Sequence, residues 1–330
     1  MPLQSRPQIL VVANVNAPYV HEDLQILEEL GPTRFLFYRG RRDLPRLIRS
    51  MIKADLVICW FALGYATTCA LVAKALRIPC VIIVGGWDVV SSAELGYGAL
   101  LSPGRWFKTH IALRFADKVI AVSEALRGEF VRNFRFNVSV LAPGVDLSLF
   151  SSDGSASLRR RQAVCVAGID SKVRYKIKGV DILLQVAAAL PDIRFYIVGR
   201  NSEEWDLKLR QLGTSNVVIA GFLTRDMLRL LFNESKAYVQ LSAYESFCVS
   251  LAEAMAAGCV PIVSDRGALP EVVDGLGFVV PYGDISSVVV AIRQAIDQPD
   301  LGLEARRRSA ERFSLERRRA GLLAAVRSLL

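Results

Sequence analysis

The chain has 330 residues, of which 52% are hydrophobic and 22% are charged. This balance excludes a disordered protein and allows two domains, each with a sizeable buried core. The formal net charge of +9 indicates an anionic partner, for which a phosphorylated substrate, an anionic membrane surface and a nucleic acid all qualify.

Short apolar runs alternate with helical patterns along the first half of the chain. Continuous apolar strands separated by helices predict a parallel sheet that is covered on both faces. The uncharged stretch 56–73 is as long as a membrane span, but Gly64 divides it, so we interpret it as a buried strand, a turn and a helix. Strands are predicted at 9–13, 35–38, 56–60, 80–84, 119–122 and 138–141, and helices near 21–30, 44–52, 67–76, 106–115 and 125–130.

A polar, serine-rich segment then interrupts this alternation and predicts a linker. We therefore predict an N-terminal Rossmann-like domain at 1–150, a linker at 151–161 and a second Rossmann-like domain at 162–303. Both are doubly wound parallel α/β domains, which bind ligands beyond the carboxyl ends of their strands and here would face a common cleft. Strands of the second domain are predicted at 163–167, 195–198, 217–220, 238–241, 260–263 and 278–280.

The arginine-rich segment 304–330 predicts basic helices, which we expect to pack back towards the N-terminal domain. Solvated basic faces and a surface that rests on anionic lipid are the two interpretations of these helices. The apolar run at 9–13 is too short for a secretory signal, so we expect a cytoplasmic protein, peripheral on the inner face of the membrane. A second basic cluster favours the lipid interpretation and comprises Arg39, Arg41, Arg42, Arg46, Arg49 and Lys53.

The sequence holds six cysteines and two histidines, with neither a CxxC pair nor a spacing typical of zinc sites. We interpret the cysteines as small buried side chains in a reducing compartment. No metal site is expected from these residues.

Two glutamates, Glu245 and Glu253, lie in the segment 238–264, YVQLSAYESFCVSLAEAMAAGCVPIVS. A helix is expected from about 247 to 257, with Gly258 as its C-cap, and its first-turn amides would form a site for a diphosphate. Glu253 lies about 9 Å along the helix axis from these amides, where a ribose would lie, whereas Glu245 lies on the side of the sugar. The alternative is two ordinary glutamates, although a bare carboxylate is costly on so apolar a helix.

A basic segment follows the strand predicted at 163–167 and ends at Gly179, before an apolar helix at 180–190. Cations at a helix N-terminus oppose the helix dipole, so this cluster predicts an anion such as a phosphate. A solvated basic loop is the alternative. The segment carries Asp170, Lys172, Arg174, Lys176 and Lys178.

These motifs resemble those of the family 4 retaining glycosyltransferases. The resemblance rests on Glu245, seven residues and Glu253, on Lys178-Gly179, on IVGR at 197–200, on APGVDLSLF at 142–150 and on ADKVIAVSEAL at 116–126. It covers nearly the whole chain and implies a GT-B fold. It also implies a metal-independent transfer of a sugar from a nucleotide-diphosphate sugar to an acceptor hydroxyl, in cell-envelope or glycan biosynthesis. The absence of any Asp-x-Asp pair is consistent with a reaction that needs no metal and no cofactor.

The family's residue roles carry over to the matching positions. Lys178, followed by Gly179, would hold the donor diphosphate, Glu245 would bind the donor sugar, and Glu253 would bind the ribose. Ile169 stands where the family often has a second phosphate-binding arginine. The other residues expected around the donor are Ser246, Phe247, Cys248 and Val249 at the phosphates, Lys172 and Arg174 as substitutes for that arginine, and Arg200 and Leu223 near the base.

The N-terminal half departs from the family pattern at two places. NVNAPY at 14–19 replaces a glycine-rich loop, and Gly85 stands where the family has a histidine. Asp88 has two interpretations: a catalytic-site residue that orients an acceptor hydroxyl, or a cap of the following turn. The residues assigned to the acceptor side are Gly85, Gly86, Trp87, Asn16 and His21.

Other functions stay open on the sequence. A catalytically silent nucleotide-sugar-binding subunit would explain Gly85 and the missing glycine-rich loop, and a non-hydrolysing nucleotide-sugar epimerase has a similar fold. A dinucleotide oxidoreductase is disfavoured because no GxGxxG follows the first strand of either domain. Nucleic acid is not an expected partner, because only the net charge favours it. The expected acceptor is lipid-linked or a glycan.

Overall fold

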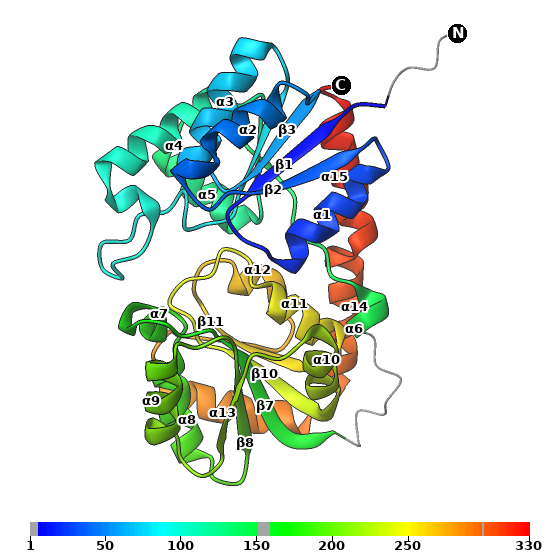
Figure 1. Ribbon diagram of the computed structural model, residues 1–330. Helices are drawn as coiled ribbons and strands as arrows, with labels where there is room; N and C mark the ends of the chain where they lie inside the picture. Colours follow the sequence, from blue (N-terminus) through cyan, green and yellow to red (C-terminus); the bar gives the residue numbers. More distant parts are fainter. Residues whose placement is uncertain (1–5, 151–158, 299) are drawn as a thin grey trace. The chain divides into compact units, whose positions relative to one another are not determined.

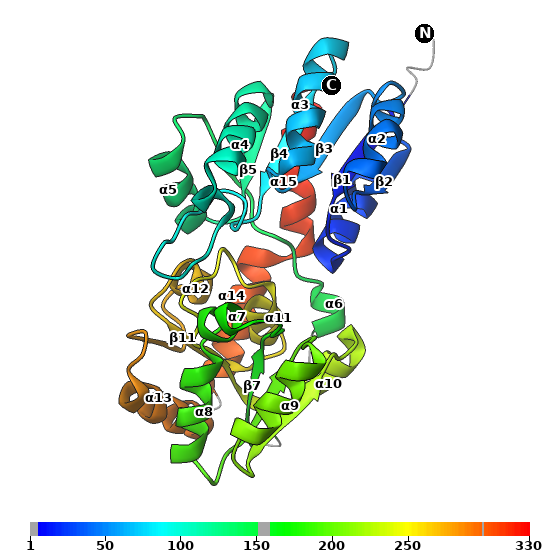
Figure 2. The same cartoon turned by 60° about the vertical axis from the view of Figure 1, so that its left-hand side comes forward.

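A computed structural model describes residues 6–150, 159–298 and 300–330 of the chain. They divide into two compact units, one formed by Met1–Gly144 with Glu316–Leu330 and the other by Val145–Leu315 (Figures 1 and 2). The first unit therefore ends before the predicted boundary at 150. The segment 304–330 is divided between the two units rather than forming one block.

The first unit is built on a parallel sheet with the strand order β2-β1-β3-β4-β5-β6. Strands β1, β3 and β4 are buried along their whole length, as expected for strands covered on both faces. The strands are β1 (Ile9–Ala13), β2 (Thr33–Phe37), β3 (Leu56–Trp60), β4 (Cys80–Val84), β5 (Lys118–Ala121) and β6 (Ser139–Val140).

Helices cover both faces of this sheet (Figure 1). Helix α3 packs against both α2 and α4, and α1 and α15 lie on the opposite face. The helices are α1 (Pro18–Glu28), α2 (Leu44–Met51), α3 (Gly64–Leu76), α4 (Pro103–Phe115), α5 (Glu124–Asn133) and α15 (Leu315–Arg327), with short 3₁₀ turns η1 (Arg41–Asp43) and η2 (Ala99–Leu101).

The second unit repeats this plan with the strand order β12-β11-β10-β7-β8-β9. Its core joins apolar side chains of the central strands to those of α8 and α13. The strands are β7 (Arg160–Val166), β8 (Arg194–Val198), β9 (Val217–Gly221), β10 (Ser235–Gln240), β11 (Val260–Ser264) and β12 (Phe278–Val280). The helices are α6 (Leu147–Phe150), α7 (Lys172–Ile177), α8 (Val180–Ala189), α9 (Glu203–Leu212), α10 (Arg225–Glu234), α11 (Val249–Ala256), α12 (Leu269–Val273), α13 (Ile285–Asp297) and α14 (Asp300–Phe313).

The predicted fold class, two doubly wound parallel α/β domains, is confirmed. The predicted linker at 151–161 lies largely outside the described residues. Its described end is not linker-like, because β7 begins at Arg160 and the Arg159 guanidinium is buried, donating to the carbonyl oxygens of Phe232 and Ser235 at 3.2 and 2.9 Å. At its other side, Phe150 belongs to α6 and its ring centroid lies 6.1 Å from that of Phe232.

The uncharged stretch 56–73 forms β3 and most of α3, as predicted. Among the helices of the described ranges, none is long and apolar enough to cross a bilayer. The strand order of the second unit reverses between β7 and β10, since β8 and β9 extend the sheet on one side and β11 and β12 on the other. Ligands of such sheets bind at this switch point, so the loops after β7 and β10 are where a site is expected.

Candidate functional site

The loops after β7 and β10 bring together two predicted residues, Lys178 and Glu245. Lys178 Nζ lies 2.6 Å from Glu245 Oε1, and the two side chains are 25% and 11% exposed. The close approach of the two loops depends on Gly179, which has φ +64°. A Cβ added at Gly179 would lie 1.9 Å from the carbonyl oxygen of Leu241. The amide of Ala243 donates to the carbonyl oxygen of Ile177 at 2.7 Å, which joins the two loops directly.

The backbone at Glu245 is held from its other side by the turn before α12. The amide of Ala268 donates to the carbonyl oxygen of Glu245 at 2.8 Å. A Cβ at Gly267, where φ is +57°, would lie 2.2 Å from the same oxygen. The Ser242 hydroxyl donates to Glu245 Oε1 at 2.9 Å. The carboxylate is therefore fixed by its own backbone, by Ser242 and by Lys178.

Helix α11 begins at Val249, later than the predicted start at about 247. Cys248 precedes it in the left-handed conformation, with φ 77°, and this turn delays the helix. Phe247 therefore lies before the first turn of α11 and not in it, and its ring centroid lies 5.1 Å from that of Phe313. The amides of Cys248, Val249 and Ser250 open the helix instead, and such amides are suited to an anion. Burial raises the pKa of the Cys248 thiol to about 11, so the thiol is neutral at pH 7.

Glu253 lies on α11 and is 7% exposed. Arg225, at the start of α10, places Nη2 3.2 Å from Glu253 Oε1, and its guanidinium carbon lies 5.4 Å from the Phe150 ring centroid. A buried carboxylate needs such a partner. The sequence analysis missed Arg225, because nothing in the spacing of the two residues marks the contact.

The basic segment after β7 is a short helix, α7, and not the predicted loop. The Ser171 hydroxyl accepts from the amide of Arg174 at 3.2 Å and caps this helix. Arg174 pairs with Asp170 at 3.2 Å, and Lys176 pairs with Asp181 at 2.6 Å. Carboxylates therefore offset part of the charge that indicated a phosphate. Of the cations in this segment, Lys178 pairs with Glu245. Lys172 lies exposed on α7.

The loops after β7, β8 and β9 also meet. A Cβ at Gly168 would lie 2.9 Å from the carbonyl oxygen of Arg200, and the amide of Gly199 donates to the carbonyl oxygen of Gly221 at 2.9 Å. The Arg200 guanidinium carbon lies 5.0 Å from the ring centroid of Phe222, which is 64% exposed. Leu223 follows and is half-buried. Phe222 directly follows β9 and lies in the turn 221–223, which the sequence places near the base through Leu223.

In the first unit, Asn16 and His21 form a hydrogen bond between Oδ1 and Nε2, near the start of α1. Trp87 is 37% exposed, and the Arg105 guanidinium carbon lies 5.3 Å from its ring. Gly85 faces a side chain instead of open space, because a Cβ there would lie 2.1 Å from Phe61 Cε1. The Phe61 ring thus occupies the space beside Gly85.

Asp88, predicted to orient an acceptor hydroxyl or to cap the following turn, lies inside the first unit. It is fully buried, and its oxygens accept from the amides of Ala62, Gly85 and Gly86 at 2.7, 3.2 and 2.8 Å. These hydrogen bonds run back to the loops after β3 and β4 and not to the turn that follows Asp88. Burial raises the pKa of Asp88 to about 6, against the opposing effect of these amides. Asp88 therefore organises the loop that carries Gly85, Gly86 and Trp87.

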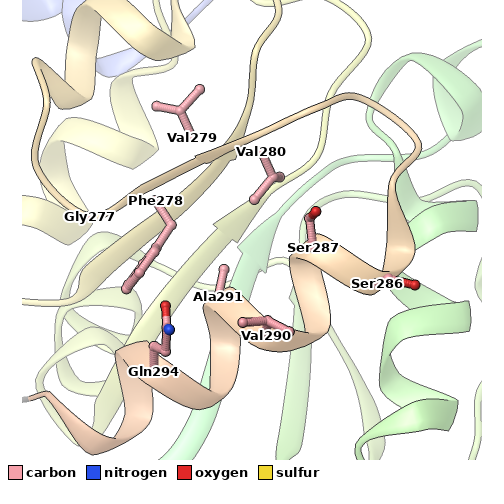
Figure 3. A pocket seen from close by; sticks show the side chains of 9 residues that line it. All are labelled: Gly277, Phe278, Val279, Val280, Ser286, Ser287, Val290, Ala291 and Gln294. Atoms are coloured by element: carbon pink, nitrogen blue, oxygen red, sulfur yellow. The ribbon is translucent and has the colours of Figure 1, made fainter.

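A cavity of about 500 Å³ lies between β12 and α13 (Figure 3). Phe278, Val280, Ala291 and Gln294 point towards it. None of the predicted donor or acceptor residues lines this cavity, so it is distinct from the Lys178–Glu245 pair.

Comparison with known proteins assigns each half of the chain. Residues 9–149 match the family described as Glycosyltransferase Family 4, and residues 171–313 match Glycosyl transferases group 1. The chain belongs to glycosyltransferase family 4. The predicted family is therefore confirmed.

Two relatives of this family 4 chain show the range of similar sequences. MMP alpha-(1->4)-mannosyltransferase of Mycolicibacterium hassiacum is 29% identical over 61% of this chain and 51% of that protein. GDP-mannose:cellobiosyl-diphosphopolyprenol alpha-mannosyltransferase of Xanthomonas oryzae is 30% identical over 48% of this chain and 44% of that protein. The chain thus spans about half the length of these relatives or less.

Solved structures share the fold over nearly the whole family 4 chain. Anabaena HepE, crystallised with UDP and glucose, has a TM-score of 0.78 and 18% identity, covering 98% of this chain and all of that one. Sucrose-phosphate synthase of Thermosynechococcus elongatus has a TM-score of 0.76 at 18% identity, covering 98% of this chain and 99% of that one. The fold class is therefore GT-B.

Proposed function

We propose that this chain is a retaining glycosyltransferase that moves a sugar from a nucleoside-diphosphate sugar to an acceptor hydroxyl. The observation that carries the proposal is the Lys178–Glu245 ion pair at the switch point of the second sheet, where Glu245 lies in the loop that leads into α11. A cation and a helix N-terminus suit the negatively charged diphosphate, and a carboxylate suits the hydroxyls of the sugar linked to it. Membership of family 4 and the names of the relatives support the same reaction class.

Each residue has a distinct task in this reaction. As the bond between the anomeric carbon and the diphosphate oxygen breaks, negative charge grows on the leaving group. The Lys178 ammonium and the amides that open α11 stabilise that charge, which is the usual main term in such catalysis. Glu245 binds hydroxyls of the donor sugar, and Glu253, held by Arg225, binds the ribose hydroxyls. Because Lys178 and the helix supply the positive potential, we expect full activity with EDTA present.

Separate binding measurements with UDP, GDP, UDP-glucose and GDP-mannose test these tasks. Glu253→Ala should weaken binding of the free nucleotide and of the sugar nucleotide alike. Glu245→Ala should weaken only the sugar nucleotide. Lys178→Ala should lower the transfer rate by about two to three powers of ten, the scale of losing one positioned charge in a transition state. Binding by both glutamate variants that equals the parent's would show that the assigned tasks are wrong.

The stereochemistry and the presence of transfer are tested on the product. NMR should show the same anomeric configuration in the product as in the donor. A catalytically silent sugar-nucleotide-binding subunit is the second candidate, and the Phe61 ring beside Gly85 favours it, because it fills space at the position of the family histidine. A parent chain that binds a donor and transfers to none of a broad acceptor panel would favour that candidate. Interconversion of UDP-sugars without an acceptor would favour the epimerase.

We also propose that α2 rests on an anionic membrane on the cytoplasmic side, and that the acceptor is lipid-linked. Leu47 and Met51 of α2 are buried, whereas Ile48 and Ile52 are 36% and 65% exposed. An exposed apolar edge among cations is typical of a helix at a lipid surface. The exposed cations around it are Arg39, Arg41, Arg42, Arg46, Arg49 and Lys53.

The C-terminal arginines support binding to a membrane less than the cations around α2 do, because several of them form ion pairs. Arg308 and Arg312 pair with Asp274 at 2.5 and 3.1 Å, while Arg318 and Arg319 pair with carboxylates of α1 and its end. These arginines hold α14 and α15 to their own units. The interpretation as packed basic helices is therefore the one that these contacts favour.

Vesicle flotation tests the membrane proposal. The parent should float with phosphatidylserine vesicles, and the binding should weaken with salt, because the attraction decays over about 8 Å at physiological ionic strength. Arg46→Glu with Arg49→Glu should abolish flotation, whereas Arg132→Glu with Arg135→Glu, the same charge change at exposed positions of the same unit, should not. Equal flotation with neutral and anionic vesicles would remove the support for this surface.

A further inference from the structure

Strand β10 carries polar side chains where a central parallel strand normally has apolar ones. Tyr238, Gln240 and the following Ser242 alternate along the chain, so they lie on the same side of the strand. All three are fully buried. Buried polar groups cost free energy unless they are hydrogen-bonded, so their partners need an account.

The three side chains form a continuous line of hydrogen bonds that ends on Glu245. Ser250 Oγ lies 2.8 Å from the Tyr238 hydroxyl, which lies 2.7 Å from Gln240 Oε1. Gln240 Nε2 lies 2.7 Å from Ser242 Oγ, which lies 2.9 Å from Glu245 Oε1. The line therefore runs from the first turn of α11 to the carboxylate that pairs with Lys178.

The carboxylate determines the direction of every bond in this line. An ionised Glu245 only accepts, so Ser242 donates to it and must accept from the amide of Gln240. That fixes the Gln240 oxygen towards Tyr238, whose phenol then donates, so Ser250 donates to Tyr238. Burial raises the pKa of Tyr238 well above 10, which keeps this phenol protonated. All of the donors thus point towards Glu245.

The line has a consequence for the face that Glu245 offers to a ligand. The bonds from Ser242 and from Lys178 both end on Oε1. With Oε1 occupied by two donors, Oε2 is the oxygen that can accept from a sugar hydroxyl. Charged hydrogen bonds of this kind are strong and directional, so the rotation of the carboxylate is restricted.

We propose that Tyr238, Gln240 and Ser242 are positioning residues that hold Glu245 with Oε2 towards the donor sugar. The inference rests on the proposed function, since it assumes that Glu245 binds that sugar. The line also starts at Ser250 in the first turn of α11, so hydrogen bonds connect the sugar-binding carboxylate to the proposed phosphate site. Breaking the line should therefore affect recognition of the sugar and leave recognition of the nucleotide intact.

The test compares two buried glutamines in the same sheet. Gln240→Met removes the centre of the line with little change in volume. Gln162→Met is the matched control, because Gln162 lies on β7, is 2% exposed, and donates Nε2 to a serine hydroxyl, that of Ser235, at 2.9 Å. Calorimetry measures Kd for UDP, UDP-glucose, GDP and GDP-mannose with each full-length variant.

Gln240→Met should raise Kd for the sugar nucleotide about tenfold, the scale of one lost hydrogen bond to a charged group, with Kd for the free nucleotide within about twofold. Gln162→Met should change neither. Ser242→Ala should act like Gln240→Met, and Ser242→Thr, which keeps the hydroxyl, should restore sugar-nucleotide binding. If Gln240→Met does not fold, the comparison of Ser242→Ala with Ser242→Thr is a sufficient test.

Two results would overturn the inference in distinguishable ways. Variants that lower the melting temperature but keep the parent's ratio of sugar-nucleotide to nucleotide Kd would show that the line is structural only. A parent chain that binds none of the four nucleotides would overturn the proposed function itself, and this inference with it.

Discussion

The buried ion pair between Arg318 and Asp23 gives a prediction for stability that the structure allows in detail. Both side chains are 2% exposed. Arg318 Nε and Nη2 donate to the two Asp23 oxygens at 2.8 and 2.6 Å, Nη1 donates to the carbonyl oxygen of Leu141 at 2.9 Å, and Trp60 Nε1 donates to Asp23 Oδ2 at 3.0 Å. Arg318→Met fills much of the volume of the stem but leaves a buried carboxylate without its cation. Breaking a buried pair in this way costs about 3–5 kcal/mol.

Scanning calorimetry measures this loss. For a domain of this size, about 1 kcal/mol lowers Tm by roughly 2–4 °C, so the transition of the first unit should fall by about 6–20 °C. Arg319→Met is the control, because the neighbouring Arg319 pairs with Glu29 while the two side chains are 53% and 38% exposed. An exposed pair contributes far less to stability than a buried one, so Tm of Arg319→Met should stay close to that of the parent.

A double variant separates charge burial from lost packing. Arg318→Met with Asp23→Asn removes the uncompensated charge and keeps an acceptor for Trp60, so it should be more stable than Arg318→Met alone. If Arg318→Met and Arg319→Met lowered Tm equally, burial would not be the reason for the effect and the reasoning would be refuted.

Three further predictions concern Asp88 and Gly85 of the first unit and Arg225 of the second. Burial raises the pKa of Asp88 from 3.8 to about 6. Between about pH 4 and 6 the folded chain therefore keeps a proton that the unfolded chain has already released. Relative to Asp88→Asn, the parent's free energy of unfolding should fall by about 3 kcal/mol as the pH rises through that window, as measured by urea titration. Gly85→Ala should destabilise by about 1–3 kcal/mol because its Cβ meets Phe61, and adding Phe61→Ala should recover part of this loss in a double-mutant cycle. Arg225→Met should raise Kd for UDP or GDP about tenfold in calorimetry, since Glu253 loses its partner, and an unchanged Kd would contradict the positioning of Glu253 by Arg225.

The strands were the most predictable part of the fold. Runs such as 56–60 and 80–84 are apolar at every position, which only a strand buried on both faces requires, and both are strands in the structure. The start of α11 was predicted too early because a left-handed Cys248 is not signalled by its residue type. The basic segment after β7 was predicted as a loop because its charges concealed the Ser171 cap and the carboxylates that pair with them.

The candidate site was predictable where local sequence determines it and not where distant residues meet. Lys178 and Glu245 follow neighbouring strands, so the topology brings them together. The partnership of Glu253 with Arg225 depends on how α10 packs, which no spacing records. The line through Tyr238, Gln240 and Ser242 did have a signal, the alternation of polar residues in a buried strand, and it was not used.

The position of α15 has a consequence for how the protein is made. Residues 316–330 complete the first unit, yet they are synthesised after the whole of the second unit, 145–315. Until they leave the ribosome, Asp23 and Trp60 lack the arginine that covers them. Domains generally fold as units during synthesis. During synthesis the residues of the second unit are therefore complete before those of the first, which lacks its last helix until the end.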